Sequence, residues 1–204
     1  MILIEGLDLA GKSTLVRGLR DELNRRGIPV RVSRNALCPE NPIAPLADAL
    51  RRDPDAGSLE TGAIFLASHV WDARHFRRPP TGTLHIQDSC WLRTLAYHTF
   101  NNTPMIPDLL RVAIPTFPRF EAAVYLTANI GQRCRRLRMR EQEQPGCNDR
   151  SDLAVVRDPI SFQELETRLR ALAEELTSAR SIDTTALGPS EIVDTVLQTV
   201  KEIT

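Results

Sequence analysis

Lysine is nearly absent from this chain of 204 residues, because Lys12 and Lys201 are its only two lysines and the other 24 of its 26 basic residues are arginine. The chain also lacks an excess of charge of either sign, since 26 acidic residues balance the basic ones. Nucleic-acid binding needs a basic surface that neutralises phosphates, and only the stretch 133–140 is densely basic. This composition excludes nucleic acid as the expected partner and leaves small anionic ligands.

Long apolar runs and paired cysteines are missing as well. No apolar stretch approaches the ~20 residues of a membrane-spanning helix, and Met1 leads directly into strand-like residues rather than into a signal peptide. Cys38, Cys90, Cys134 and Cys147 form no C-x-x-C motif, which argues against a zinc or redox site. We expect a cytoplasmic protein with reduced thiols and no membrane contact. Its length fits one domain over residues 1–204.

One motif stands out near the start of the chain. Residues 6–14 read Gly-Leu-Asp-Leu-Ala-Gly-Lys-Ser-Thr, and the apolar run Met1–Ile4 comes directly before them. This is G-x-x-x-x-G-K-S between a predicted strand and a predicted helix, which is the pattern of a phosphate-binding loop. A glycine-containing turn without function is the alternative, but the strand before the motif and the helical spacing of Leu15, Val16 and Leu19 after it favour the loop.

The chemistry of the motif predicts a site for ATP and Mg²⁺. Glycines allow a row of backbone N–H groups to curl around phosphate oxygens at a helix N-terminus. Lys12 is expected to reach the terminal phosphates, and Ser13 to offer its hydroxyl to Mg²⁺. The predicted donor-binding residues are Gly6, Leu9, Ala10, Gly11, Lys12, Ser13 and Thr14.

Strand-like runs alternate with helix-like segments along the whole chain. The predicted strands are 1–4, 28–33, 83–88, 121–127 and 181–184. The predicted helices are 12–26, 43–52, 58–76, 92–100, 129–140, 161–178 and 189–202, with short helical pieces in the proline-rich stretch 104–118. This alternation predicts a three-layer α/β P-loop fold: a five-stranded parallel sheet covered by helices on both faces, with ligands at the carboxyl ends of the strands.

Two further features complete the predicted site. Asp88 ends the third predicted strand, where a P-loop enzyme places the acid that holds Mg²⁺; the same residue could also cap the following helix. The arginine-rich helix and the polar segment 141–157 after it have the pattern of a mobile helical lid at about residues 133–157.

With these motifs the chain resembles the thymidylate kinase family of nucleoside monophosphate kinases. The segment Glu5–Ser13 matches the family's Glu-Gly-x-Asp-x-x-Gly-Lys-Ser/Thr, including the acid at Asp8. The resemblance implies that Asp8 faces the acceptor sugar and that Arg34 lies near the acceptor phosphate. It also implies that Phe65 stacks on the acceptor base and that Tyr97, in an Ala-Tyr pair, lies near the sugar.

Three positions depart from the family pattern, and all lie on the acceptor side. Ser89 replaces the arginine of an Asp-Arg pair, His69 replaces an arginine four residues after Phe65, and His98 replaces a glutamine. Arg93 comes one helical turn after Ser89, so we expect it to restore the lost cation, unless the acceptor itself differs. His69 is a candidate for binding an altered acceptor.

The resemblance also suggests a source for the cation that stabilises the transition state. In one subgroup of the family this arginine lies in the phosphate loop, and in the other the lid provides it. Leu9 occupies the loop position here, so the expected donors are Arg136, Arg138 and Arg140. With Lys12 and Asp88 they form the predicted catalytic set.

The predicted function is therefore an ATP-dependent kinase that transfers the γ-phosphoryl group to a nucleoside monophosphate or a related phosphate ester. The altered acceptor positions keep open a kinase of a non-nucleotide specialised metabolite. A regulatory GTPase is disfavoured because Asn-Lys-x-Asp is missing and Asp88 does not open an Asp-x-x-Gly motif. Resemblance implies a homodimer.

Overall fold

The computed structural model describes residues 1–53, 56–146 and 150–203. Its centre is a parallel five-stranded sheet with the strand order β2-β3-β1-β4-β5. The strands are β1 (Ile2–Glu5), β2 (Val30–Arg34), β3 (Leu84–Asp88), β4 (Ala122–Thr127) and β5 (Arg180–Asp183). The α/β class and the parallel sheet predicted from the sequence are confirmed.

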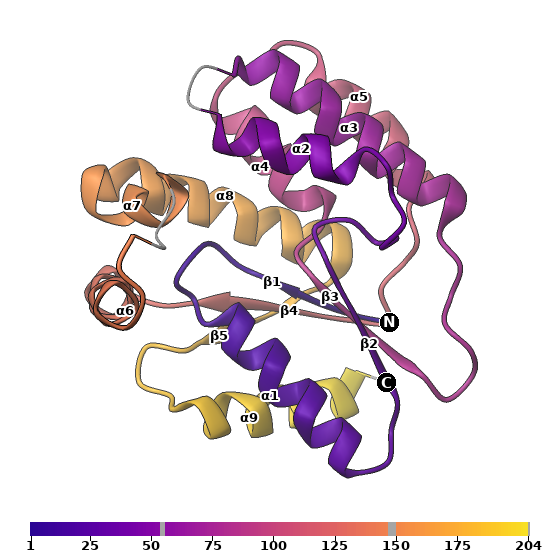
Figure 1. Ribbon diagram of the computed structural model, residues 1–204, viewed down its shortest axis with the longest axis vertical. Helices are drawn as coiled ribbons and strands as arrows, with labels where there is room; N and C mark the ends of the chain where they lie inside the picture. The colour runs from indigo at the N-terminus through magenta and orange to yellow at the C-terminus, as the bar shows by residue number, and fades with distance from the viewer. Residues whose placement is uncertain (54–55, 147–149, 204) are drawn as a thin grey trace.

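Helices cover both faces of this sheet (Figure 1). One face is covered by α1 (Lys12–Arg25) and α9 (Pro189–Ile203), and the other by α4 (Trp91–Phe100) and α8 (Pro159–Thr177). Beyond α4 lie α2 (Ala44–Arg52), α3 (Ser58–His75) and α5 (Ile106–Ala113), the last followed by a 3₁₀ turn at Ile114–Thr116. The helices α6 (Ile130–Glu143) and α7 (Arg150–Arg157) lie at the carboxyl edge of the sheet, on the left in Figure 1.

The alternation of side chains along β1 explains the two cores. Ile2 and Ile4 face α1 and α9, where they pack with Leu15 and Val196. Leu3 points to the opposite face, into the cluster formed with α4 and α8. A strand buried on both faces reads as a continuous apolar run, which is why Ile-Leu-Ile was recognisable as a strand. Each fully buried Leu or Ile contributes about 1.5–3 kcal/mol of transfer free energy.

The central position of β1 places the phosphate loop in the middle of the carboxyl edge. Parallel pairing aligns Ile4 with Asp88 of β3 and Glu5 with Tyr125 of β4. The end of β3 therefore lies beside the point where the chain leaves β1. Ligand sites in open α/β sheets form at this edge, where the carboxyl ends of neighbouring strands meet.

The main difference from the sequence analysis lies in the expected lid. Segment 141–157 reads as polar, but α6 continues to Glu143 and α7 occupies Arg150–Arg157. Val155 explains the second helix, because its buried side chain joins the core cluster next to Phe162 of α8. The tip of the expected lid, Cys147 to Asp149, lies outside the described residues.

Two expectations from composition can be compared with the described chain. No helix in residues 1–53, 56–146 or 150–203 combines the length and apolar character that crossing a membrane requires. Cys38, Cys90 and Cys134 are free thiols. Burial raises the pKa of Cys38 to about 12, which makes this thiol unreactive at neutral pH.

Candidate active site

The phosphate loop, residues 6–14, turns sharply from β1 into α1. Gly6 adopts φ 143°, and a Cβ atom there would lie 2.3 Å from the carbonyl oxygen of Leu126 in β4. Gly11 adopts φ 100° as the N-cap of α1. Between them Leu9 takes φ 65°, a left-handed conformation that is costly for a residue with a branched side chain. Both glycines of the motif are therefore required by the backbone.

Lys12 lies inside this turn rather than in solvent. Its side chain is buried, and Nζ donates hydrogen bonds to the carbonyl oxygens of Gly6 at 2.6 Å and Leu7 at 3.1 Å. The pKa of Lys12 is lowered from 10.5 to about 8. Burial is the main cause and the charge of Arg93 adds to it, while the carboxylates of Asp8 and Asp88 partly oppose the shift. An ammonium group held in this way lacks a full set of anionic partners, which a phosphate would provide.

The lowered pKa of Lys12 gives a pH-dependent expectation for nucleotide binding. A bound triphosphate favours the charged amine and raises its pKa, so binding takes up protons at pH values near 8. We expect ATP affinity to be constant below about pH 8 and to fall by up to about tenfold per pH unit above it. Calorimetry in two buffers of different ionisation enthalpy measures this uptake. The expectation fails if the affinity stays constant up to about pH 9.5.

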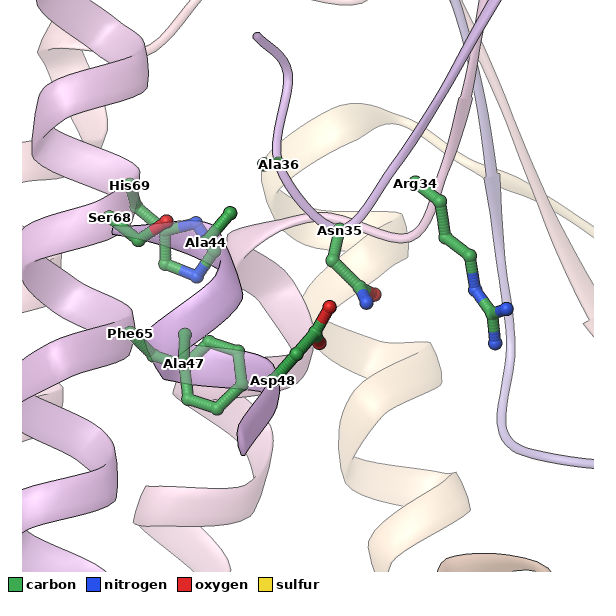
Figure 2. Close-up of a pocket in the computed structure, with 9 residues that line it drawn as sticks. All are labelled: Arg34, Asn35, Ala36, Ala44, Ala47, Asp48, Phe65, Ser68 and His69. Carbon is green, nitrogen blue, oxygen red and sulfur yellow. The ribbon is translucent and has the colours of Figure 1, made fainter. Parts of the chain in front are cut away.

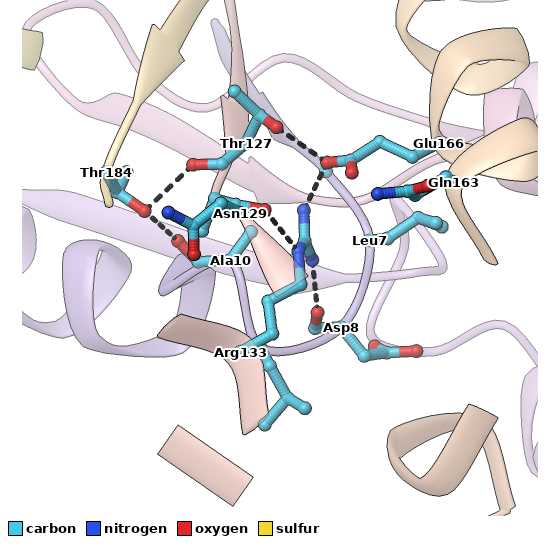
Figure 3. Close-up of polar contacts among 12 residues, drawn as sticks. Leu7, Asp8, Ala10, Thr127, Asn129, Arg133, Gln163, Glu166 and Thr184 are labelled. Carbon is cyan, nitrogen blue, oxygen red and sulfur yellow. Dashed lines mark hydrogen bonds and ion pairs between the residues drawn. The ribbon is translucent and has the colours of Figure 1, made fainter. Parts of the chain in front are cut away.

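Three carbonyl groups of the phosphate loop, those of Asp8, Leu9 and Ala10, are held by contacts from outside the loop. Besides the two contacts of Lys12, the Leu9 oxygen accepts from Arg136 at 2.9 Å and the Ala10 oxygen from the Thr184 hydroxyl at 2.9 Å. The Asp8 oxygen accepts from Arg133 (Figure 3). Since the carbonyl and the following N–H of one peptide point in opposite directions, outward carbonyls turn N–H groups inward. The loop therefore has the preformed shape of an anion site.

A Mg²⁺ ion fits the oxygen ligands next to the loop. Ser13 lies exposed in the first turn of α1, and the buried carboxylate of Asp88 ends β3, close enough for its charge to act on Lys12. No group of three or more His, Cys, Asp or Glu residues in the described chain could hold a metal. Mg²⁺ does not need one, because it is commonly held by one or two protein oxygens together with phosphates and water.

Two acids on either side of Gly6 link the loop to α4. The buried carboxylate of Glu5 accepts from the backbone N–H of Gly6 at 2.9 Å and of Cys90 at 3.2 Å, and burial raises its pKa. Asp8 forms an ion pair with Arg93 at 3.0 Å, and Arg93 also donates to the Gly6 carbonyl at 3.3 Å. Arg93 therefore reaches the loop, where its charge is shared with Asp8. Whether it replaces the cation missing at Ser89 stays a prediction.

Three of the expected acceptor residues, Arg34, Phe65 and His69, line one small pocket between β2, α2 and α3 (Figure 2). The other three, Asp8, Arg93 and Tyr97, are not part of its lining. Arg34 at the end of β2 extends into solvent with a side chain 66% exposed, and its Nε lies 3.9 Å from Asp88. Phe65 and His69 come from α3, with rings stacked at 6.2 Å. The cavity holds about 20 Å³, so the helices around it must separate before a base can enter.

The two histidines that replace family residues are both buried and hydrogen-bonded within the fold. His69 is buried, its Nε2 lies 2.9 Å from the Thr94 hydroxyl, and burial lowers its pKa to about 4. At neutral pH it is therefore uncharged and cannot substitute for an arginine. His98 lies against Gly62 of α3 and pairs with Thr103 at 3.1 Å. Gly62 leaves room for this ring, since a Cβ atom there would lie 2.7 Å from Cε1 of His98.

The predicted lid arginines separate into three environments. Arg136 is half-buried, and its guanidinium donates hydrogen bonds to the Leu9 carbonyl and to the hydroxyl and carbonyl oxygens of Thr184. Arg138 is exposed, one helical half-turn away. Arg140 pairs with Asp152 of α7 at 2.9 Å. The structure thus brings Arg136 to the phosphate loop, whereas Arg138 and Arg140 lie further along α6.

Several residues of this region were not found from the sequence. Arg133, Thr184 and Glu166 contact the loop or its supports, and Asp48 of α2 lines the acceptor pocket. Arg133 was visible only as part of an arginine-rich run, and the others carry no local signal. Tyr97, on α4 one turn after Arg93, is half-buried.

Comparison with known proteins supports the fold and gives two similar kinases. No family model matches the chain. A cytidylate kinase from Shouchella clausii (strain KSM-K16) is 34% identical over 86 residues, or 42% of this chain and 37% of that protein. The chain thus matches little more than a third of the length of this curated relative. The structure of a thymidylate kinase from Candida albicans superimposes with a TM-score of 0.67 over 98% of this chain and 90% of that one, at 15% identity. The chain therefore has the same fold as this thymidylate kinase, which is the fold that the resemblance implied.

Proposed function

We propose that the protein is an ATP-dependent kinase that transfers the γ-phosphoryl group to a nucleoside monophosphate. The observation that carries this proposal is the preformed phosphate loop with its buried Lys12, next to Asp88 at the carboxyl edge of the sheet. Both similar proteins are nucleoside monophosphate kinases, which favours the same chemistry. A phosphate ester of a non-nucleotide metabolite is the alternative acceptor, motivated by the exchanges at Ser89, His69 and His98.

The roles of the residues follow from the charge that moves during transfer. The bond from the γ-phosphorus to the β–γ bridging oxygen breaks while a bond to an oxygen of the acceptor phosphate forms. Loop N–H groups and Lys12 bind the donor phosphates. Ser13 and Asp88 would hold Mg²⁺, which supplies neutralisation of phosphate charge when bound. Arg136, which already contacts the phosphate loop, provides a guanidinium group for the transferred group. Arg138 and Arg140 lie further along α6 and join it after α6 moves toward the phosphates.

The acceptor side has one cation that can move to a phosphate. Arg34 is largely exposed and only loosely paired with Asp88, whereas His69 is neutral and Arg93 is shared with Asp8. A guanidinium binds phosphate with two parallel hydrogen bonds. We therefore assign the acceptor phosphate to Arg34, with Arg93 supporting it, the base to Phe65 and the sugar to Asp8 and Tyr97.

A specific feature of the pocket favours cytidylate over thymidylate. In Figure 2 the carboxylate of Asp48 points from α2 toward Asn35, beside the ring of Phe65. A carboxylate accepts hydrogen bonds only, so if Asp48 faces position 4 of a pyrimidine it suits the amino group of cytosine and is repelled by the oxygen of thymine or uracil at that position. The relative with 34% identity is a cytidylate kinase, which agrees with this preference.

The test of the proposed function is acceptor-dependent ADP formation from ATP and Mg²⁺. The acceptors are CMP, dCMP, UMP, dTMP, AMP and GMP, and nucleosides without phosphate serve as controls. We expect turnover of at least one monophosphate and none of the nucleosides. Absence of turnover with every monophosphate, although ATP binds, would favour the non-nucleotide alternative.

Asp48→Asn tests the acceptor assignment. An amide both donates and accepts hydrogen bonds, so the variant should no longer discriminate against a carbonyl oxygen. We expect kcat/KM for CMP to fall by about tenfold or more, while kcat/KM for dTMP or UMP stays constant or rises. Asp108→Asn, an exposed carboxylate on α5, is the matched control. An unchanged ratio of CMP to dTMP in Asp48→Asn would show that Asp48 does not read the base.

Two expectations about the whole molecule belong to the same proposal. A kinase of free nucleotides works in the cytoplasm, and the resemblance to thymidylate kinases implies a homodimer. Size-exclusion chromatography with light scattering measures the number of chains per particle directly, since one chain has a mass of 22.9 kDa.

A further inference from the structure

Arg133 is the largest fully buried side chain among the described residues. Its Nε donates to the carbonyl oxygen of Ala128 at 2.8 Å, and its two terminal nitrogens donate to the Asp8 carbonyl and to the Glu166 carboxylate (Figure 3). The guanidinium also lies 5.1 Å from the ring centre of Phe162. A single side chain thus connects α6, α8 and the phosphate loop.

Stability alone is a weak reason for this arrangement. Burying a guanidinium and a carboxylate together costs desolvation free energy that their attraction only partly returns, and apolar side chains of similar volume often replace such pairs without loss. Burial also lowers the pKa of Arg133, although Glu166 opposes the shift. What an apolar side chain cannot replace is the hydrogen bond to the Asp8 carbonyl.

We propose that Arg133 is a positioning residue for the donor site: by holding the Asp8 carbonyl outward it turns the N–H of Leu9 toward the donor phosphates. The inference rests on the proposed function, since it requires that a triphosphate occupies the loop. The carbonyl of Asp8 and the N–H of Leu9 belong to one trans peptide and point in opposite directions, so fixing the first fixes the second.

The conformation of Leu9 shows why this peptide needs support. Its φ of 65° is strained for a non-glycine residue and persists only where the surroundings enforce it. Arg133 holds the peptide before Leu9, and Arg136, one turn later on α6, holds the carbonyl of Leu9 itself at 2.9 Å. The base of the helix that leads to the lid therefore determines the shape of the loop.

Glu166 keeps the guanidinium in place. Its Oε1 accepts from Arg133 and from the Thr127 hydroxyl at 2.8 Å, so the carboxylate is anchored to β4 while it binds the arginine. The side chain of Glu166 is 13% exposed. Asp8, whose carbonyl is bound by Arg133, is also bound through its carboxylate by Arg93. Both ends of Asp8, the carbonyl and the carboxylate, are thus bound to arginines from different helices.

The test separates positioning of the loop from stability of the fold. Arg133→Met alone leaves the carboxylate of Glu166 buried without its partner, so the informative variant is Arg133→Met combined with Glu166→Leu, which removes both charges. Arg133→Lys is the conservative variant, because an ammonium on a shorter stem keeps the charge but cannot reach all three acceptors at once. Arg170→Met, an exposed arginine on α8, is the control. Each is measured for melting temperature without nucleotide, ATP affinity by calorimetry, and KM for ATP and for the acceptor.

We expect the double variant to bind ATP about tenfold or more weakly, with the acceptor KM changed by less than about threefold and the melting temperature close to wild type. Arg133→Lys should restore part of the affinity. ATP affinity equal to wild type in a folded double variant would overturn the inference. If the double variant does not fold, Arg133→Lys decides: weaker ATP binding supports the inference, and unchanged binding overturns it. Wild-type protein that binds no ATP would instead refute the proposed function.

Discussion

Replacing Lys12 by methionine is expected to lower kcat by about 10²–10³-fold or more, the loss seen when one positioned donor to transition-state charge is removed. The ammonium of Lys12 reaches the loop interior, and no other lysine or arginine of the described chain occupies that position in the phosphate loop. Methionine keeps the length and the apolar stem, so the loss isolates the charge.

The same substitution should not destabilise the fold below pH 8. Because the pKa of Lys12 is lowered from 10.5 to about 8 in the folded protein, the charged amine opposes folding at pH values below 8, and this cost disappears above 10.5. Lys201→Met is the matched control, since Lys201 is the only other lysine and is exposed in the last turn of α9. Phosphoryl transfer by Lys12→Met at the wild-type rate would contradict the donor assignment.

Asp88→Asn is expected to have the second largest effect, a loss of about 10²–10³-fold in kcat at low Mg²⁺. Asparagine has the same shape but no charge, so β3 and its pairing with β1 should persist. Because a neutral amide is a poorer ligand for a hard cation, the Mg²⁺ concentration for half-maximal rate should rise.

Kinetics at several Mg²⁺ concentrations measure this effect. Asp194→Asn, an exposed carboxylate on α9, controls for the change of one surface charge. If Asp88→Asn keeps the wild-type rate and the wild-type Mg²⁺ dependence, then the role of Asp88 is limited to its contacts with Arg34 and with the Ser89 hydroxyl. Asp88 does not cap α4, because the N-cap residue of this helix is Cys90 and no side chain caps it.

The parts of the fold that were predictable are those encoded by local patterns. The strand before the phosphate loop is a continuous apolar run because β1 is buried on both faces, and Gly6 and Gly11 are fixed by backbone geometry. Predicted strand and helix ends agree with the structure to within about two residues for most elements, apart from α6, which runs on to Glu143. The phosphate loop was found because its motif lies in a single stretch of chain.

Features that depend on distant segments were not predictable. α7 was missed because its one buried apolar side chain, Val155, is hidden among polar neighbours. Arg133 and Arg136 belong to one arginine-rich run in the sequence. That these two contact the carbonyl groups of the phosphate loop is visible only in the folded structure. His69 and His98 were possible ligands by sequence, but their burial against Thr94 and Thr103 depends on how α3 and α4 pack.

The most direct test of the account is a calorimetric titration of the protein with a non-hydrolysable ATP analogue in the presence of Mg²⁺. We predict one site per chain with a dissociation constant between about 1 μM and about 1 mM, and binding weakened in Lys12→Met but not in Lys201→Met. Absence of binding heat at millimolar analogue, confirmed by an unchanged melting temperature, would contradict the central claim that residues 6–14 bind a triphosphate.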